Sequence, residues 1–165
     1  MNQALKLSKA EKAQAEVLQE LRPGQSVELL KELHILTREG LLNQDSRRKL
    51  KQVYHLYQFI EKRLLELAEE GANATLADHG AGKSYLGFII YDLFFRPRGG
   101  QGHVYGIETR PELVERSRTL AARLGFERMG FLNLSVAEST TASTLPQRID
   151  VLTALHALES ATHDA

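Results

Sequence analysis

The sequence predicts an α/β fold in which a parallel sheet follows a helical N-terminal region. Apolar residues recur at helical spacing through residues 1–70, and short apolar runs alternate with helical segments after that. A glycine turn joins the first of these runs to a hydrophobic helix. Strands that alternate with helices are typical of a parallel sheet. We therefore expect two parts, a helical region over residues 1–70 and an α/β core over residues 71–165.

Composition restricts the function classes. The chain has 21 Lys and Arg against 21 Asp and Glu, so its net charge is zero and the whole molecule is not an obvious polyanion binder. It has no cysteine, which excludes disulfides, thiolate metal ligands and a cysteine nucleophile. The N-terminus has no apolar signal segment, and the longest apolar stretch, residues 86–95, contains Asp92 and is too short for a bilayer. We expect a cytoplasmic protein without metal or membrane contact.

Three helices are expected in the first part, each with an end signal in the sequence. Pro23 and Gly24 end the first helix, and Ser26 caps the start of the second. Gly71 follows the third as the residue that favours a helix C-terminus. The expected helices cover residues 5–21, 27–38 and 45–70.

The second part alternates between short apolar runs and helical segments. The expected strands are residues 74–77, 103–107, 131–136 and 150–155. The expected helices are residues 83–95 and 111–124, and the polar residues 137–147 are expected to form a loop. Pro111 begins the second of these helices, at the position where proline is favoured.

One interpretation of the glycine turn is a phosphate loop. Ala77-x-x-x-x-Gly82-Lys83-Ser84 differs from the phosphate-loop pattern only at the first glycine. Lys83 would then contact the terminal phosphates of ATP or GTP, and Ser84 would bind magnesium. This interpretation requires the preceding strand to end before Ala77, and a second acid, for which Glu108 is the candidate.

The other interpretation is an adenosylmethionine loop, which has the form acid-x-Gly-x-Gly. Asp78, Gly80 and Gly82 match this form, and the glycines let the backbone approach a ligand closely. Asp78 is expected to accept from the cationic ligand, or else to cap the next helix. Glu108 ends the next strand, where a carboxylate can accept both ribose hydroxyls. An NAD fingerprint fits poorly because Tyr85 stands where a third glycine belongs.

Residues 78–86 resemble the first motif of a bacterial class I methyltransferase family, acid-x-Gly-x-Gly-Lys-[Gly/Ser]-Tyr-Leu, which methyltransferase-like relatives share. Residues 150–157 are similar to its fourth strand, which runs into Leu-His-Ala, and residues 52–61 to the helix before its core. The resemblance implies a Rossmann-like fold, S-adenosylmethionine as cofactor, and methyl transfer to N, O or C of an acceptor.

The chain departs from that family after the fourth strand. The family continues with Cys-Asp where this chain has Leu158 and Glu159, and its members extend to a later cysteine-rich segment. By resemblance the chain would hold only strands one to four of an incomplete sheet. We expect a fragment, or a second copy or partner chain that completes the sheet. A non-catalytic cofactor-binding or assembly module is a further alternative.

Five further residues are expected near the cofactor. Glu138 follows the third strand, where the adenine amino group is often contacted, although a plain loop acid fits as well. His156 ends the fourth strand and is the candidate general base, since a pKa near 6.5 suits neutral pH; a structural histidine is the alternative. The catalytic residues are otherwise not identified. His79 and Ala81 in the turn and Thr109 beside the second acid complete the set.

A basic run lies on the third expected helix. It consists of Arg47, Arg48, Lys49 and Lys51. Such a run can contact nucleic-acid phosphates or simply form a solvated helix face. RNA is therefore one acceptor class that the sequence leaves open.

Overall fold

The computed structural model describes the chain except residues 1–5, 81–84, 100–101, 140–144, 147 and 155–165. The chain forms two compact units, residues 1–54 and 55–165, and their boundary falls within helix α3 (Gln44–Glu69). The predicted division near residue 70 stays a prediction. In the part of the chain that the structure describes, no helix has both the length and the apolar content needed to cross a bilayer.

The first unit contains α1 (Lys9–Glu20) and α2 (Val27–Glu32). Ser26 caps α2 as predicted, because its hydroxyl accepts from the backbone N–H of Leu29. The predicted extension of α2 to residue 38 is wrong. His34 takes a left-handed conformation with φ of 58°, and its N–H and that of Ile35 bond back to carbonyls of the last helical turn. These backbone bonds end the helix without a glycine.

Helix α3 follows its predicted pattern closely. Asn43 caps its start by accepting from the backbone N–H of Ser46 at 2.8 Å. Gly71 ends it in a left-handed conformation, φ 76°, as predicted. Apolar positions at helical spacing are buried along its length: Leu50, Val53, Tyr57, Leu64 and Leu67.

The second unit is built on a four-stranded parallel sheet. Its strands are β1 (Thr75–His79), β2 (His103–Glu108), β3 (Met129–Asn133) and β4 (Val151–Thr153). Their spatial order is β3-β2-β1-β4, so the order reverses between β1 and β4. Asp78 on β1 stands beside Gly106 on β2 and beside Thr153 on β4. The predicted parallel α/β fold is confirmed.

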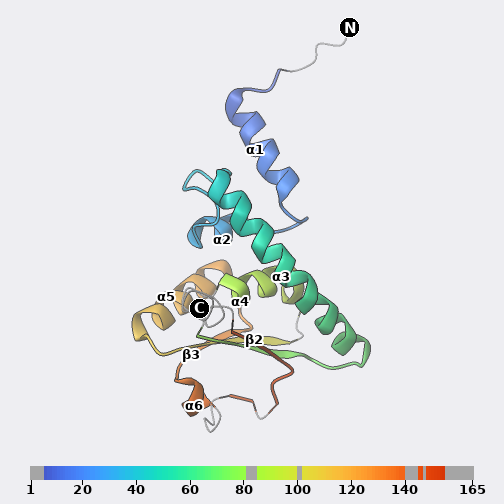
Figure 1. Cartoon of the computed structure of the whole chain (residues 1–165), viewed down its shortest axis with the longest axis vertical. Helices are drawn as coiled ribbons and strands as arrows, with labels where there is room; N and C mark the ends of the chain where they lie inside the picture. Colours follow the sequence, from blue (N-terminus) through green and yellow to red (C-terminus); the bar gives the residue numbers. More distant parts are fainter. Residues whose placement is uncertain (1–5, 81–84, 100–101, 140–144, 147, 155–165) are drawn as a thin grey trace, which may run out of the picture. The chain divides into compact units, whose positions relative to one another are not determined.

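Helices α4 (Tyr85–Ile90) and α5 (Pro111–Leu124) lie on one side of this sheet, and the short α6 (Val136–Ser139) lies on the other (Figure 1). A π-helical turn, η1 (Tyr91–Phe95), continues α4. The core between helices and sheet is aromatic. Phe88 stacks on Phe131 with ring centroids 5.4 Å apart, and Tyr91 lies 4.7 Å from Phe126.

Several predicted boundaries in this unit are wrong. The first strand runs to His79 instead of ending at residue 77, and β4 is shorter than the expected residues 150–155. The third strand begins at Met129 instead of residue 131, because Gly130 pairs with Tyr105 and leaves room for its ring. The segment after this strand was expected to be extended and then a loop, but it contains α6. Ser135 and Glu138 explain this, since they bond reciprocally through side chain and backbone in a capping box.

Arg128, which precedes β3, connects the amino end of β2 to the end of η1. Its guanidinium donates to the carbonyl of Phe95 at 2.6 Å and to that of Gly102 at 3.1 Å. Gly102 is left-handed, with φ of 80°, and a Cβ there would lie 2.3 Å from the ring of Phe95. This position accepts only glycine without rearrangement.

Candidate functional site

The polar residues that the sequence singles out lie at the carboxyl ends of β1 and β2. In open α/β sheets, ligands bind outside these ends, at the point where the strand order reverses. Here that point lies between β1 and β4, beside Asp78 and Thr153. The architecture therefore brings Asp78, His79 and Gly80 to the expected place, with Glu108 at the end of the adjacent strand.

Asp78 is buried, with 3% of its surface exposed. Its Oδ1 accepts from the hydroxyl of Thr153 at 2.7 Å, and the carboxylate also accepts from the backbone N–H of Gly87 in α4. Burial raises the pKa of Asp78 from 3.8 to about 6, although both hydrogen bonds favour the ionised form. The bond to Gly87 corresponds to the capping role that the sequence offered as the alternative for this acid.

His79 points to the opposite face of the sheet from Asp78, because successive strand residues alternate. Its Nε2 lies 2.9 Å from the hydroxyl of Ser139, the last residue of α6. Its Nδ1 is buried and has no hydrogen-bond partner among the described residues. Burial lowers the pKa of His79, which favours the neutral ring. A neutral ring keeps one nitrogen as donor and one as acceptor.

Gly80 begins the turn after β1 with φ of 62°. This conformation is readily adopted by glycine, and a Cβ at Gly80 would have no atom within 4 Å. Backbone geometry, not crowding, therefore favours glycine here. The predicted contacts of Ala81, Gly82, Lys83 and Ser84 lie outside the described residues.

Glu108 ends β2 and is buried. Its Oε1 accepts from Nε of Arg110 at 2.6 Å and from the Arg110 backbone N–H at 3.3 Å. This contact raises the pKa of Arg110. Thr109 is exposed, and its carbonyl accepts from Asn133 Nδ2 at 3.0 Å.

Asn133 was not singled out from the sequence. It ends β3 and also donates to the carbonyl of Glu108 at 3.3 Å, so it joins the carboxyl ends of β2 and β3. The sequence signal for Asn133 was a polar residue directly after an apolar run, at the end of the strand. Glu138 is exposed in the capping box of α6, which the Ser-x-x-Glu spacing could have indicated. His156 lies outside the described residues.

Strand β1 bears on the phosphate-loop interpretation. In that interpretation the strand ends before Ala77, and the loop begins there. The structure instead pairs Ala77, Asp78 and His79 with β2. The first three positions of the pattern therefore belong to the sheet, which disfavours a phosphate loop.

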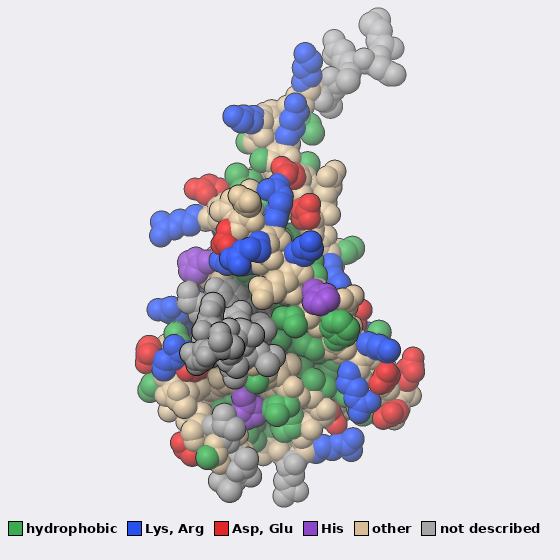
Figure 2. Space-filling view, viewed as in Figure 1, with side chains coloured by type: hydrophobic (Ala, Val, Ile, Leu, Met, Phe, Trp, Pro, Cys, Tyr) green, Lys and Arg blue, Asp and Glu red, His purple; other side chains and the backbone are tan. Residues whose placement is uncertain are grey.

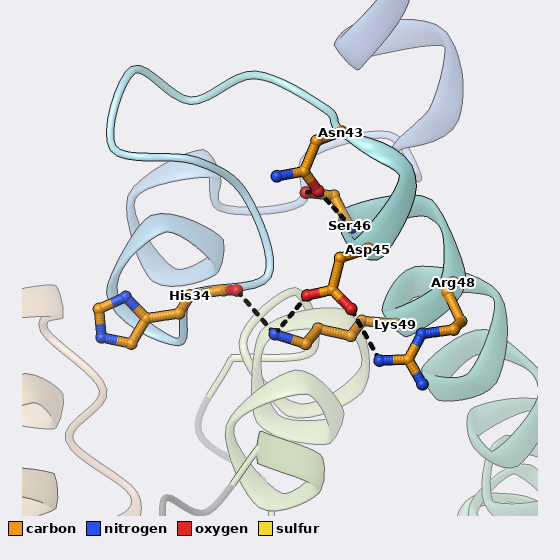
Figure 3. Close-up of polar contacts among 6 residues, drawn as sticks. All are labelled: His34, Asn43, Asp45, Ser46, Arg48 and Lys49. Atoms are coloured by element: carbon orange, nitrogen blue, oxygen red, sulfur yellow. Dashed lines mark hydrogen bonds and ion pairs between the residues drawn. The ribbon is translucent and has the colours of Figure 1, made fainter.

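Three residues of the basic run on α3, Arg47, Arg48 and Lys49, are paired within their own unit. Arg48 and Lys49 bind the carboxylate of Asp45 at 2.7 and 3.0 Å, and Lys49 also donates to the carbonyl of His34 at 3.2 Å (Figure 3). These contacts hold the pKa of Asp45 below its usual value. Arg47 pairs with Glu16 of α1. Figure 2 shows Asp and Glu side chains among the Lys and Arg side chains on this face of the molecule.

The sheet order, the glycine after β1 and the acid ending β2 define an α/β domain of the kind that binds nucleotide-like ligands. Within that class, the chain belongs to the methyltransferase domain family. The family's sequence profile, described as a methyltransferase domain, matches residues 48–165. No curated protein matches the chain.

The chain is similar to solved structures of methyltransferases at low identity, of which three are described. A Podospora anserina methyltransferase bound to SAH is 11% identical, with 93% of this chain and 61% of that chain covered and a TM-score of 0.47. A SAH-bound magnesium protoporphyrin IX methyltransferase from Synechocystis is 15% identical, with 79% and 53% covered and a TM-score of 0.45. A protein-L-isoaspartate O-methyltransferase is 18% identical, with 56% and 27% covered and a TM-score of 0.41. The chain spans less than two thirds of each.

Proposed function

We propose that the chain is the cofactor-binding portion of an S-adenosylmethionine-dependent methyltransferase. One observation carries the proposal: in a member of the methyltransferase domain family, the acidic and glycine positions Asp78, Gly80 and Glu108 lie at adjacent strand ends beside the reversal of strand order. We also propose that it belongs to the bacterial group whose first motif its residues 78–86 resemble.

The residues present fit this cofactor. Glu108 can accept both ribose hydroxyls, as strand-end acids do in dinucleotide folds. Gly80 leaves the backbone open to close approach, and the buried Nδ1 of His79 has hydrogen-bonding capacity that no described residue satisfies. Ala81, Gly82, Thr109, Glu138 and His156 are kept as proposed contacts. Asp78 connects β1 to α4 through Gly87 and to β4 through Thr153.

Adenosylmethionine supplies an electrophilic methyl group on its sulfonium when bound. The contribution of the chain is then to bind and orient, which brings acceptor and methyl group into line. We propose that an N, O or C atom of the acceptor would take the methyl group directly as the S–CH3 bond breaks, with S-adenosylhomocysteine as the leaving group. His156 is kept as the proposed general base, since a neutral imidazole can take up the proton that an N–H or O–H acceptor loses.

The acceptor, the location and the oligomeric state stay predictions. The expectation that RNA is the acceptor depends on the basic run. The carboxylates of Asp45 and Glu16 pair with this run and so reduce the positive charge available to bind phosphates. We retain a cytoplasmic location, and a second copy or partner chain at the sheet, as proposals. A non-catalytic cofactor-binding module is distinguished by a methyl-transfer assay against candidate acceptors.

Calorimetric titration with S-adenosylhomocysteine tests the proposal, with magnesium-ATP as the parallel ligand. We expect the former to bind and the latter not to bind. Glu108→Ala should weaken S-adenosylhomocysteine binding about 10- to 100-fold, because a charged hydrogen bond contributes about 1.5–3 kcal/mol. Glu115→Ala is the matched control, since it also removes an acid paired with an arginine, but from the exposed face of α5.

Binding of magnesium-ATP alone, abolished by Lys83→Ala, would replace the proposal with the phosphate loop. Equal weakening by Glu108→Ala and Glu115→Ala would remove Glu108 from the site. If neither ligand binds the folded chain, the proposal fails for this chain in isolation.

A further inference from the structure

The carboxylate of Asp78 joins three elements at the carboxyl end of the sheet. It belongs to β1, accepts from the hydroxyl of Thr153 on β4 at 2.7 Å, and accepts from the backbone N–H of Gly87 on α4. Asp78 and Thr153 are also register partners in the parallel β1–β4 pair, which is the pair where the strand order reverses. Thr153 was not singled out from the sequence.

The glycine turn lies between the two ends that this carboxylate connects. Gly80 leaves β1 in a left-handed conformation, and α4 begins at Tyr85, two residues before Gly87. The Asp78 side chain therefore connects the end of β1 directly to the first turn of α4.

We infer that Thr153 is a positioning residue of the proposed cofactor site, whose hydroxyl fixes the orientation of Asp78 between the end of β1 and the first turn of α4. The inference rests on the proposed function for its link to the cofactor. It assigns to β4 a role in cofactor binding that requires no contact between Thr153 and the cofactor.

The surroundings of Asp78 make the hydroxyl important. The sequence of α4, Tyr85–Ile90, contains no Asp, Glu, Lys, Arg or His, and neither does β4. On β2 the residue beside Asp78 is Gly106, and the acid further along that strand, Glu108, is paired with Arg110. His79 points to the other face. Among the described residues, the polar groups shown to face the carboxylate are thus the Thr153 hydroxyl and one backbone N–H.

The test compares Thr153→Val, which replaces the hydroxyl by a methyl group of similar size, with Thr153→Ser, which keeps the hydroxyl. Thr119→Val is the matched control, because it removes a threonine hydroxyl that donates to the carbonyl of Glu115 on the exposed face of α5. The dissociation constant of S-adenosylhomocysteine is measured for each at pH 5.5, 7.0 and 8.0, with melting temperature and circular dichroism to confirm folding.

We expect Thr153→Val to weaken binding at pH 7.0 by about tenfold, in line with a lost charged hydrogen bond. We expect Thr153→Ser to stay within about twofold of the wild type, and the control to match the wild type. In an Asp78→Asn background, Thr153→Val should add nothing further, because the effect passes through Asp78. If Thr153→Val does not fold, Thr153→Ala takes its place.

Two results would overturn the inference. One is that Thr153→Val weakens binding equally in the wild-type and Asp78→Asn backgrounds, and the other is that Thr153→Ser weakens binding as much as Thr153→Val. A separate readout is the Asp78 carboxyl titration followed by 13C NMR, in which Thr153→Val should raise the midpoint and serine should restore it. If S-adenosylhomocysteine does not bind the wild type, the proposed function fails, and this titration alone decides whether Thr153 positions Asp78. An Asp78 titration midpoint that is unchanged in Thr153→Val would refute the positioning role of Thr153.

Discussion

Asp78 shows how burial and hydrogen bonding oppose each other at a single carboxyl group. Two donors favour its charged form, yet burial raises its pKa to about 6. Desolvation is therefore the larger effect. Its neighbour His79 shows the same effect with opposite sign, since burial lowers the pKa of a base. At the carboxyl end of β1, burial therefore disfavours the charged form of both side chains.

The raised pKa of Asp78 gives a stability prediction. Because the folded state binds this proton more tightly than the unfolded state, its contribution is fully present below the unfolded pKa of 3.8 and is lost as pH rises through about 6. The loss is roughly 3 kcal/mol at most. We expect Asp78→Asn to remove this fall in the free energy of unfolding, measured by urea titration between pH 4.5 and 7.5.

Asp45→Asn is the control for that experiment. The pKa of Asp45 is shifted downward by Arg48 and Lys49, so this change should leave the fall above pH 4.5 in place. A wild-type protein whose stability does not decrease between pH 4.5 and 7.5 relative to Asp78→Asn would contradict the assigned environment of Asp78.

At the scale of elements, the sequence predicted helices and strands where their patterns were local. The alternation of apolar runs and helices predicted the parallel sheet, and Ser26, Gly71 and Pro111 marked helix ends that the structure confirms. The errors at the end of α2 and at α6 concern local backbone and capping contacts, whereas the early start of β3 depends on a tertiary contact. Gly130 lies within a strand because the ring of Tyr105 packs against it, and no local pattern reveals that.

The candidate site was predictable in part for the same reason. Strand ends indicated Asp78 and Glu108, since a strand followed by a turn is visible in the sequence. Thr153 and Asn133 were not predictable as partners, because their contacts depend on which strands are neighbours. The pairing of β4 with β1 brings together residues 75 positions apart.

The junction of η1 with β2 gives a second stability prediction. Gly102→Ala should lower the free energy of unfolding by about 2–4 kcal/mol, because a Cβ would overlap the ring of Phe95 and the left-handed backbone would be strained. Thermal or urea unfolding measures it. Gly24→Ala is the control, since Gly24 is also left-handed but has nothing within 4 Å. Equal losses would attribute the whole effect to backbone strain.

At the scale of the whole molecule, the sheet of the described residues has β4 at one edge, and Leu152 of that strand is 63% exposed. An exposed apolar edge strand favours pairing with another chain. We expect concentration-dependent association in light scattering, and we expect Leu152→Lys to reduce it. Leu18→Lys, at a similarly exposed leucine of α1, should leave it unchanged. A wild-type chain that stays monomeric at all concentrations would refute this expectation.

The hydrogen bonds of Arg128 have a consequence for which substitutions this domain can accept. The contact of Arg128 with Gly102 lies at the amino ends of β3 and β2, while Asp78 and Glu108 lie at the carboxyl ends of β1 and β2. Substitutions at the carboxyl ends leave the Arg128–Gly102 contact in place, but those that remove the Asp78–Thr153 contact also change stability. An engineer who alters ligand preference at the carboxyl ends should therefore keep that contact or replace it.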